Sequence, residues 1–286
     1  MHFYLTEGLQ DAAHQEYIDK CSFSRAVESQ TNLVRGGNGG KYIVFSPVSE
    51  DELIKIDEIR DTKYKKLRFL YLPHQQTLVV KMMLSMVHQL AASLVERMLW
   101  EKTTPMGLGR ELADMRGTRY QGLSGTSKEA DCAFKPESRP LGTNWPTLVI
   151  ECGVSETVER LKVDANWWLT NSSGAVGIVL LFSITEADHT ILIEKWEMGD
   201  MEILKSTPEH PLRTAMAPQL TDSITIPQPA DGERSLSLSF TKVFDRGPVR
   251  VEDQDGDADD DSLERDIVFT PLDLSQWAAE IWRRSQ

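Results

Sequence analysis

Two apolar, strand-like segments of the sequence each contain one acidic residue. Asp131 stands in KEADCAF (128–134), and Glu151 stands in LVIECG (148–153). An unpaired carboxylate is costly to bury in such a run, so each acid needs a compensating partner. The two acids are twenty positions apart, and a Pro- and Gly-bearing stretch, 136–146, lies between their runs. We therefore expect a hairpin that brings both carboxylates to one end of a sheet.

Two converging carboxylates are a usual way to hold a hard divalent cation such as Mg²⁺ or Mn²⁺. In a second interpretation, each acid pairs with a Lys or Arg nearby, because structural ion pairs are common in proteins. On spacing alone, the ion pairs are the more frequent arrangement. Asp131 and Glu151 are thus candidate metal ligands and candidate catalytic residues.

The composition is typical of a soluble globular protein. The chain has 286 residues, of which 40% are hydrophobic and 26% charged, enough for one large domain or two small ones. No apolar run approaches the roughly 20 residues that span a bilayer, and the N-terminus lacks the pattern of a signal peptide. Three cysteines, Cys21, Cys132 and Cys152, have no CxxC spacing and indicate reduced thiols. We expect an intracellular protein, in the cytoplasm or nucleus, with no membrane partner.

The net charge of −13 argues against a strong nucleic-acid binder, because contacts with phosphates require a basic surface. Much of this charge is local, since Glu252 to Asp266 holds nine acids and one arginine, a contribution of −8. The rest of the chain carries −5, which is −13 minus −8, and leaves room for a basic face. Nucleic acid therefore remains a candidate partner.

The expected elements alternate between helices and strands. The polar first forty residues are helix-like at best and end in a glycine cluster, 36–40, that is typical of a loop. Two β-rich runs at 67–72 and 77–82 predict a hairpin. The order predicts an α/β fold with helices packed on a mixed sheet. We expect further strands at 41–47, around Asp131, and at 147–153, 176–184, 190–198, 223–226, 236–243 and 267–270, and helices at 49–60, 85–100, 110–115, 155–170 and 274–284.

The chain is expected to consist of a core, 67–200, with an N-terminal extension, 1–66, packed on it and a C-terminal extension, 201–286. Ordered-looking elements follow the acidic stretch 252–266, which predicts a surface loop rather than a tail. Asp253 to Asp257 superficially suggests an EF-hand loop. The terminal Glu and the flanking helices are missing, so a solvated acidic loop is favoured.

A series of motifs in the core follows the order helix, Asp-bearing strand, Glu-bearing strand, helix and strand. The motifs are LVVKM (78–82), SMVHQ (85–89), KEAD (128–131), WPTLVIE (145–151), GVSET (153–157), Leu161, DANWWL (164–169) and IEKWE (193–197). This order resembles the PD-(D/E)xK nuclease superfamily, which has the restriction-endonuclease-like fold. More closely, it resembles the Uma2-type branch and its fungal relatives.

The resemblance implies a nuclease that hydrolyses the phosphodiester bonds of DNA or RNA with Mg²⁺ or Mn²⁺. In that superfamily, residues matching Asp131 and Glu151 hold the metal, which polarises the scissile phosphodiester and helps generate hydroxide from water. A lysine then stabilises the developing negative charge or positions the attacking water. An acid on the first helix often completes such a site.

Two of these four positions differ from the superfamily pattern. Gly153 stands where the lysine is expected, and Gln89 stands at the position of the helix acid. Lys162, on the following helix, and Lys128, near Asp131 in sequence, are candidates for a migrated catalytic lysine. Asp164 stands where Uma2-type relatives can have a lysine.

Other polar and aromatic side chains near the two acids have simpler explanations. Glu129 and Glu156 could be further carboxylates near the metal, but surface charge is favoured for both. His88 could lie near the site on the first helix, but a helix histidine with satisfied hydrogen bonds is favoured over a ligand. Helical position predicts that Trp168 is in the core and Trp167 is half-exposed, which favours packing over base stacking.

The sequence thus supports two main functions. The first is a metal-dependent nuclease that uses Asp131 and Glu151, with Lys162 or Lys128 as its lysine. The alternative is a nuclease-like fold that has lost catalysis and acts as a binding or protein-interaction module, which Gly153, Gln89 and the acidic surface favour. A third interpretation is a different fold in which the two acids form structural salt bridges.

Overall fold

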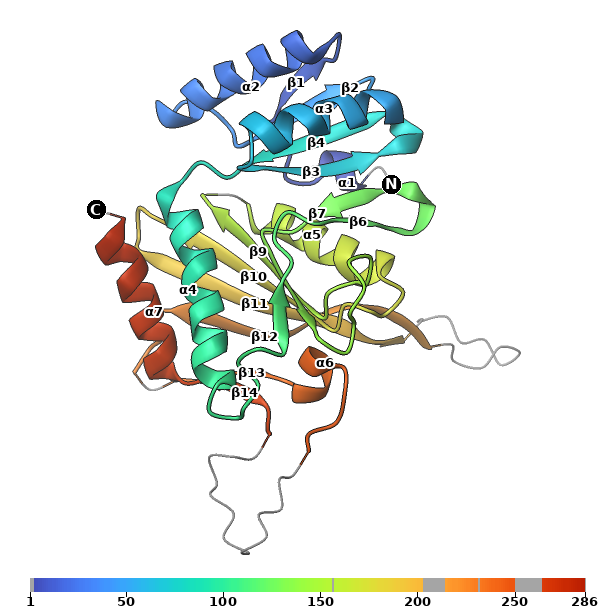
Figure 1. Ribbon diagram of the computed structural model, residues 1–286. Helices are drawn as coiled ribbons and strands as arrows, with labels where there is room; N and C mark the ends of the chain where they lie inside the picture. Colours follow the sequence, from blue (N-terminus) through green and yellow to red (C-terminus); the bar gives the residue numbers. More distant parts are fainter. Residues whose placement is uncertain (1–2, 156, 203–213, 231, 250–263, 286) are drawn as a thin grey trace, which may run out of the picture.

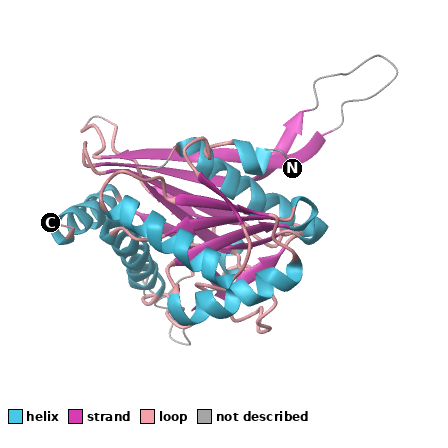
Figure 2. Ribbon diagram, turned by 90° about the horizontal axis from the view of Figure 1, so that it is seen from above, coloured by secondary structure: helices cyan, strands magenta, loops and turns pink. Residues whose placement is uncertain are grey.

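The computed structural model describes the whole chain except residues 1–2, 156, 203–213, 231, 250–263 and 286. It is a mixed α/β protein in which two six-stranded sheets lie among helices (Figure 1). Figure 2 shows helices flanking the strands. The helices are α1 (Phe3–Thr6), α2 (Lys20–Arg35), α3 (Glu50–Lys63), α4 (Met86–Thr103), α5 (Val158–Asn171), α6 (Phe240–Phe244) and α7 (Pro271–Arg284).

The first sheet has the strand order β1-β2-β4-β3-β7-β6. Its β1–β2 pair is parallel and its other pairs are antiparallel. The strands are β1 (Ala13–Glu16), β2 (Tyr42–Ser46), β3 (Leu67–Leu72), β4 (Thr77–Met82), β6 (Arg119–Gln121) and β7 (Ser127–Glu129). Two of these strands, β6 and β7, thus come from a segment that follows α4 in sequence.

The second sheet has the order β12-β11-β10-β9-β8-β5. Its β9–β10 pair is parallel, with α5 as the crossover, and its other pairs are antiparallel. The strands are β5 (Leu112–Asp114), β8 (Cys132–Pro136), β9 (Leu148–Val154), β10 (Ile178–Thr185), β11 (Thr190–Glu202) and β12 (Thr214–Ile226). Two short strands, β13 (Leu236–Leu238) and β14 (Ile267–Phe269), pair separately.

Three apolar cores hold these layers together. One core joins α2 and α3 to the outer face of the first sheet. A second core joins α5 to the inner face of the first sheet and to one face of the second sheet. A third core joins α4, α6 and α7 to the opposite face of the second sheet. Helix α5 is therefore covered by β-structure on both sides, which determines the surroundings of every side chain on it.

Several predicted elements are confirmed. The hairpin at 67–72 and 77–82 is β3 and β4, with the same bounds and antiparallel pairing. The helix predicted from 49 is α3, where Ser49 and Glu52 form a capping box that satisfies free N–H groups of the first turn. The acid-bearing runs also pair as an antiparallel hairpin, β8 and β9.

Three predictions were wrong in whole or in part. The helix predicted at 110–115 is the strand β5, which pairs with β8. The β-like run at 236–243 ends after three residues as β13, and α6 follows. The first forty residues contain a strand, β1, besides two helices. Most of the acidic stretch 252–266, including Asp253 to Asp257, lies outside the described residues.

Candidate functional site: a buried ionic cluster between the sheets

Asp131 lies at the point where the chain passes from the first sheet to the second. Strand β7 ends at Glu129, and β8 begins at Cys132. Asp131 is therefore between two strands rather than inside one, which corrects the predicted single strand. Because Cys132 pairs with Ile150, the next position along the hairpin brings Asp131 close to Glu151.

The alternation of β9 explains why Glu151 faces the space between the sheets. Ile150 and Cys152 belong to the core beneath α4, whereas Val149 packs with α5. Since neighbouring strand residues point to opposite faces, Glu151 lies on the same face as Val149. Both acids are buried there, with relative exposures of 0% for Asp131 and 1% for Glu151.

One oxygen of Asp131 accepts three hydrogen bonds. Its Oδ2 lies 2.9 Å from Lys81 Nζ, 3.1 Å from His88 Nε2 and 2.8 Å from the backbone nitrogen of Cys152. Burial alone would raise the pKa of Asp131, but the positive charge of Lys81 and the contact with His88 hold this pKa well below its usual range. Asp131 is therefore an ionised carboxylate inside the protein.

Glu151 has a different environment from Asp131. Its Oε1 accepts a 2.6 Å hydrogen bond from Trp168 Nε1 and lies 3.2 Å from Lys128 Nζ. Burial raises the pKa of Glu151 to about 8, against the attraction of Lys128, and the nearby Asp131 carboxylate adds to the rise. The two acids thus differ in protonation near neutral pH.

A second ion pair lies beside Glu151. Lys128 Nζ is 2.9 Å from Asp164 Oδ1, and Arg160 Nη2 is 3.7 Å from the same oxygen. Burial would lower the pKa of Lys128, but Asp164 and Glu151 outweigh it and raise this pKa. Asp164 has a lowered pKa, because Lys128 and Arg160 overcome the effect of burial. We call the following seven side chains the ionic cluster: Lys81, His88, Lys128, Asp131, Glu151, Arg160 and Asp164.

Lys81 lies where the two acids converge. Besides its bond to Asp131, its ammonium nitrogen is 2.8 Å from the carbonyl oxygen of Cys152 and 3.9 Å from Glu151 Oε2. Lys81 belongs to β4 of the first sheet, whereas the oxygens around it belong to the second sheet or to the junction at Asp131. A protein cation thus stands at the position that a metal ion between these acids would take.

The fit of a divalent metal can be judged from these groups. Asp131 Oδ1 and Glu151 Oε2 are buried without a hydrogen-bond partner, as metal ligands would be. The Lys81 ammonium, however, lies between the acids and would repel a second cation there. In the described part of the chain, no three or more His, Cys, Asp and Glu side chains are grouped to hold a metal ion. The residues in this arrangement do not fit Mg²⁺.

The cavity on the side of the cluster where Lys81 and Lys128 lie is also small. A cavity of about 10 Å³ is lined by Lys81, Lys128, Arg160 and Asp164, together with residues of the first sheet. This volume is at the limit for a single water molecule and is far below that of a phosphodiester. On this side, the cluster therefore has charged groups with perturbed pKa values but a cavity too small for a phosphodiester.

The structure brings Lys128 to Glu151, at 3.2 Å, but does not bring Lys162 to either acid. The Lys162 side chain is 39% exposed, and its nitrogen lies 4.0 Å from Glu194 Oε1. Gln89 donates to the carbonyl of Ser85 in its own helix. Glu156 lies outside the described residues.

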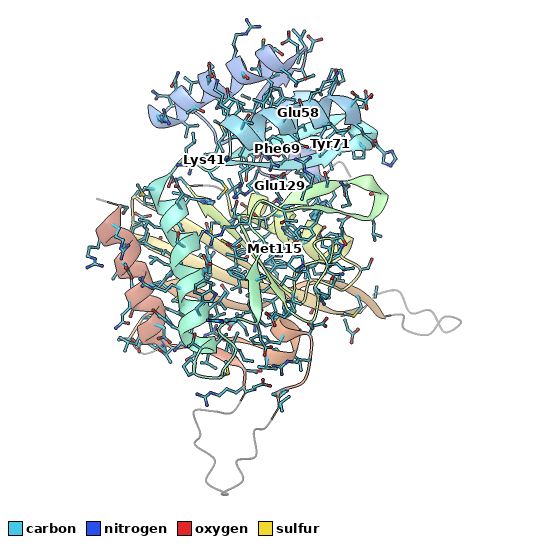
Figure 3. All side chains as sticks on the ribbon, in the orientation of Figure 1. Lys41, Glu58, Phe69, Tyr71, Met115 and Glu129 are labelled. Atoms are coloured by element: carbon cyan, nitrogen blue, oxygen red, sulfur yellow. The ribbon has the colours of Figure 1, made fainter. Side chains whose placement is uncertain are left out.

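Glu129 was assigned to the surface, and this prediction was wrong. Its carboxylate is fully buried and pairs with Arg60 at 2.6 Å and Arg119 at 2.9 Å. Both guanidinium groups lie over the ring of Phe69, 5.4 Å from its centroid. Figure 3 labels Glu129 and Phe69 near the lower side of the first sheet. Glu129 thus belongs to a separate ion-pair network.

Trp167 was predicted to be half-exposed but is fully buried, like Trp168. The two indoles are 5.0 Å apart in an edge-to-face arrangement, and Trp145 and Tyr120 complete the aromatic group. Helix α5 is covered by both sheets, so neither face of its aromatic segment is open to bases. Packing is therefore the role of these rings.

Sequence reasoning missed Lys81 and Arg160 as members of the site. Lys81 did carry a signal, since it is a charged residue in the apolar run LVVKMM (78–83). That is the same anomaly that identified Asp131. Arg160 gave no such signal, because an arginine in the first turns of a helix is usually solvated.

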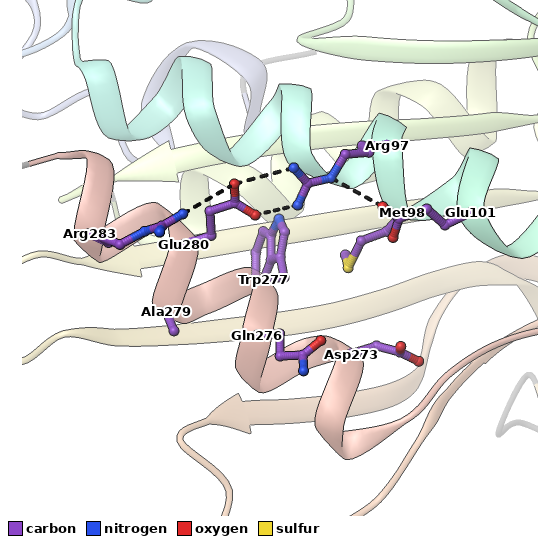
Figure 4. A pocket seen from close by; sticks show the side chains of 9 residues that line it. All are labelled: Arg97, Met98, Glu101, Asp273, Gln276, Trp277, Ala279, Glu280 and Arg283. Carbon is purple, nitrogen blue, oxygen red and sulfur yellow. Dashed lines mark hydrogen bonds and ion pairs between the residues drawn. The ribbon is translucent and has the colours of Figure 1, made fainter.

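A separate pocket of about 410 Å³ lies between α4 and α7 (Figure 4). Arg97 and Glu280 form an ion pair across it, beside the indole of Trp277. Its lining includes no residue of the ionic cluster. The charged groups of this pocket are largely paired with each other.

Comparison with known proteins does not assign the chain to a family. No family model matches it, and no curated protein matches it either. Within the described residues, no helix combines the length and hydropathy required to cross a membrane.

Proposed function

We propose that this chain is a nuclease-like α/β protein without metal-dependent catalysis, which acts as a binding or protein-interaction module. The observation that carries the loss of catalysis is the position of Lys81. Its ammonium contacts Asp131 and the Cys152 carbonyl at the point where a catalytic metal would sit. A lysine that neutralises Asp131 replaces the positive charge of a metal ion and occupies its place.

The order of elements in the second sheet supports the nuclease-like fold. Helix α4 precedes the antiparallel strands β5, β8 and β9, and α5 then leads to β10, which is parallel to β9. Asp131 lies directly before β8, and Glu151 lies on β9. This agrees with the order of motifs on which the resemblance to the PD-(D/E)xK superfamily rests.

Phosphodiester hydrolysis also needs access. A metal, an attacking water and the scissile phosphate must meet in one site. Asp131 and Glu151 are both buried, and the cavity lined by their partners Lys81 and Lys128 has a volume of about 10 Å³. Each of the three cations, Lys81, Lys128 and Arg160, is paired with an ionised carboxylate of the same cluster, Asp131 or Asp164. The cations of the cluster thus have their counter-charges within the cluster itself.

The experiment is a metal titration combined with a cleavage assay. Isothermal calorimetry with Mg²⁺ and Mn²⁺ at millimolar concentration is expected to show no saturable binding. Incubation with single- and double-stranded DNA and RNA in Mn²⁺ is expected to give no cleavage above that of an Asp131→Asn/Glu151→Gln variant purified in parallel. Metal-dependent cleavage by the wild type that is lost in this variant would instead establish the nuclease.

A further inference from the structure

A large pocket opens on the outer side of the first sheet, at the C-terminal ends of α2 and α3. Its volume is about 640 Å³, and it is lined from both helices, the loop before β3 and Leu84 after β4. No residue of the ionic cluster lines it. A ligand here would bind independently of that cluster, so this site goes beyond the proposed function.

The rim of this pocket is positively charged. Arg35, Lys63, Lys65 and Lys66 line it, and Glu28 is its one acid. Lys63 is paired with Glu28. Among the described residues, the other three cations have no carboxylate within ion-pair distance. Four cations and one acid give the rim a charge of +3, in a chain whose net charge is −13.

Helix termini explain only part of this charge. Arg35 and Lys63 stand in the last turns of α2 and α3, where a cation is favoured by the helix dipole. Lys65 and Lys66 follow the end of α3, and both side chains are exposed. In the described chain, neither lysine side chain forms an ion pair that would account for its presence there.

The floor of the pocket is apolar. Val27 and Leu67 are buried, and Leu84 is partly buried beside them. The ring of Tyr64 lies at one side, held by a 2.9 Å hydrogen bond from its hydroxyl to Glu28. A ligand that used the whole pocket would therefore need a carbon-rich part as well as negative charge.

We propose that this pocket binds a phosphorylated organic molecule of about nucleotide size. Pockets for small ligands are commonly about 300–1,000 Å³, mostly apolar, with a few polar groups that fix orientation. Phosphate groups would lie against Lys65, Lys66 and Arg35, and the apolar part would cover Val27, Leu67 and Leu84. Such charge-assisted contacts are among the stronger hydrogen bonds in proteins.

The test is a calorimetric titration of the full chain at low ionic strength with ATP, AMP, pyrophosphate and citrate. Saturable binding is expected for ATP, with weaker binding for AMP, which carries less charge, and for pyrophosphate, which lacks the apolar part. Citrate supplies carboxylates in place of phosphates and is expected to bind more weakly than ATP.

Lys65→Ala/Lys66→Ala is expected to weaken ATP binding by at least about tenfold. Arg25→Ala/Lys55→Ala is the matched control, because it removes two exposed cations from α2 and α3 outside the pocket. Circular dichroism checks that both variants are folded. The proposal is overturned if none of the four probes binds, if pyrophosphate or citrate binds as tightly as ATP, or if the control weakens binding equally.

Discussion

Lys81 and Asp131 form a 2.9 Å ion pair that joins the first sheet to the junction between the two sheets. Both side chains are almost fully buried, so the pair is shielded from water and salt. The consequences of removing either partner are therefore larger than those expected for a surface ion pair.

Lys81→Met is expected to lower the free energy of unfolding by about 3–5 kcal/mol, because it leaves the Asp131 carboxylate buried without its main counter-charge. Urea denaturation followed by circular dichroism measures this loss. The double variant Lys81→Met/Asp131→Asn is expected to regain at least half of it, since both charges are then absent. A double variant no more stable than Lys81→Met would contradict the pairing. Lys55→Met, at an exposed position on α3, is the control and should change stability little.

Stability is expected to fall as pH rises through the pKa of Glu151. This pKa is about 8 in the folded protein and 4.5 for an ordinary glutamate, so between these values the folded state holds a proton that the unfolded state has released. The proton on Glu151 therefore stabilises the folded state most at the lower end of this range. This stabilisation is lost as pH rises through about 8.

The measurement is urea unfolding of the wild type and of Glu151→Gln at several pH values between about 5 and 9. Glutamine is neutral throughout, so its profile should be flatter than that of the wild type. Parallel profiles for the two proteins would show that Glu151 does not titrate in this range.

Trp168→Phe is expected to destabilise the protein by about 2 kcal/mol, through a smaller ring in a packed core and the lost hydrogen bond to Glu151. Trp100→Phe is the matched control, because Trp100 is 45% exposed on α4. Thermal denaturation of both variants gives the comparison. Equal shifts in the two melting temperatures would argue against a specific role of the buried indole.

Gly8→Ala is expected to weaken the packing of residues 3–12 against α5. Gly8 has φ of +66°, and a Cβ added there would be 2.4 Å from Arg160 Cβ. Gly37 has a similar φ of +75° but has open space around it, so Gly37→Ala carries only the backbone strain of about 1–2 kcal/mol. Hydrogen exchange of residues 3–12 should accelerate in Gly8→Ala and stay unchanged in Gly37→Ala. Unchanged exchange in both variants would refute the close packing.

Local sequence signals predicted those parts of the fold that depend on neighbouring residues. The β3–β4 hairpin follows from two β-rich runs around Pro73, and α3 follows from the Ser49 capping box. The pairing of the Asp131 and Glu151 runs was also predictable, because a short turn region connects them.

Long-range contacts decided the parts that could not be predicted. The segment around Leu112 contains good helix formers, yet it pairs with β8, 20 to 24 residues later. Trp167 is buried because the first sheet covers the outer side of α5. The local sequence of that helix gives no sign that a sheet covers this side. Lys81 meets Asp131 fifty positions away, so its role became visible only in the fold.

The passage of the chain from β5 in the second sheet to β6 and β7 in the first, and back to β8, has a consequence for cooperativity. Neither sheet is built from one uninterrupted stretch of sequence. A fragment that ends after β4 lacks β6 and β7, two strands of the first sheet. The remaining fragment lacks Lys81 and the strand β3, with which β7 pairs. Unfolding of one sheet would therefore remove strand pairing and the Lys81–Asp131 ion pair that the other sheet needs. Calorimetry should record the unfolding of both sheets as a single transition.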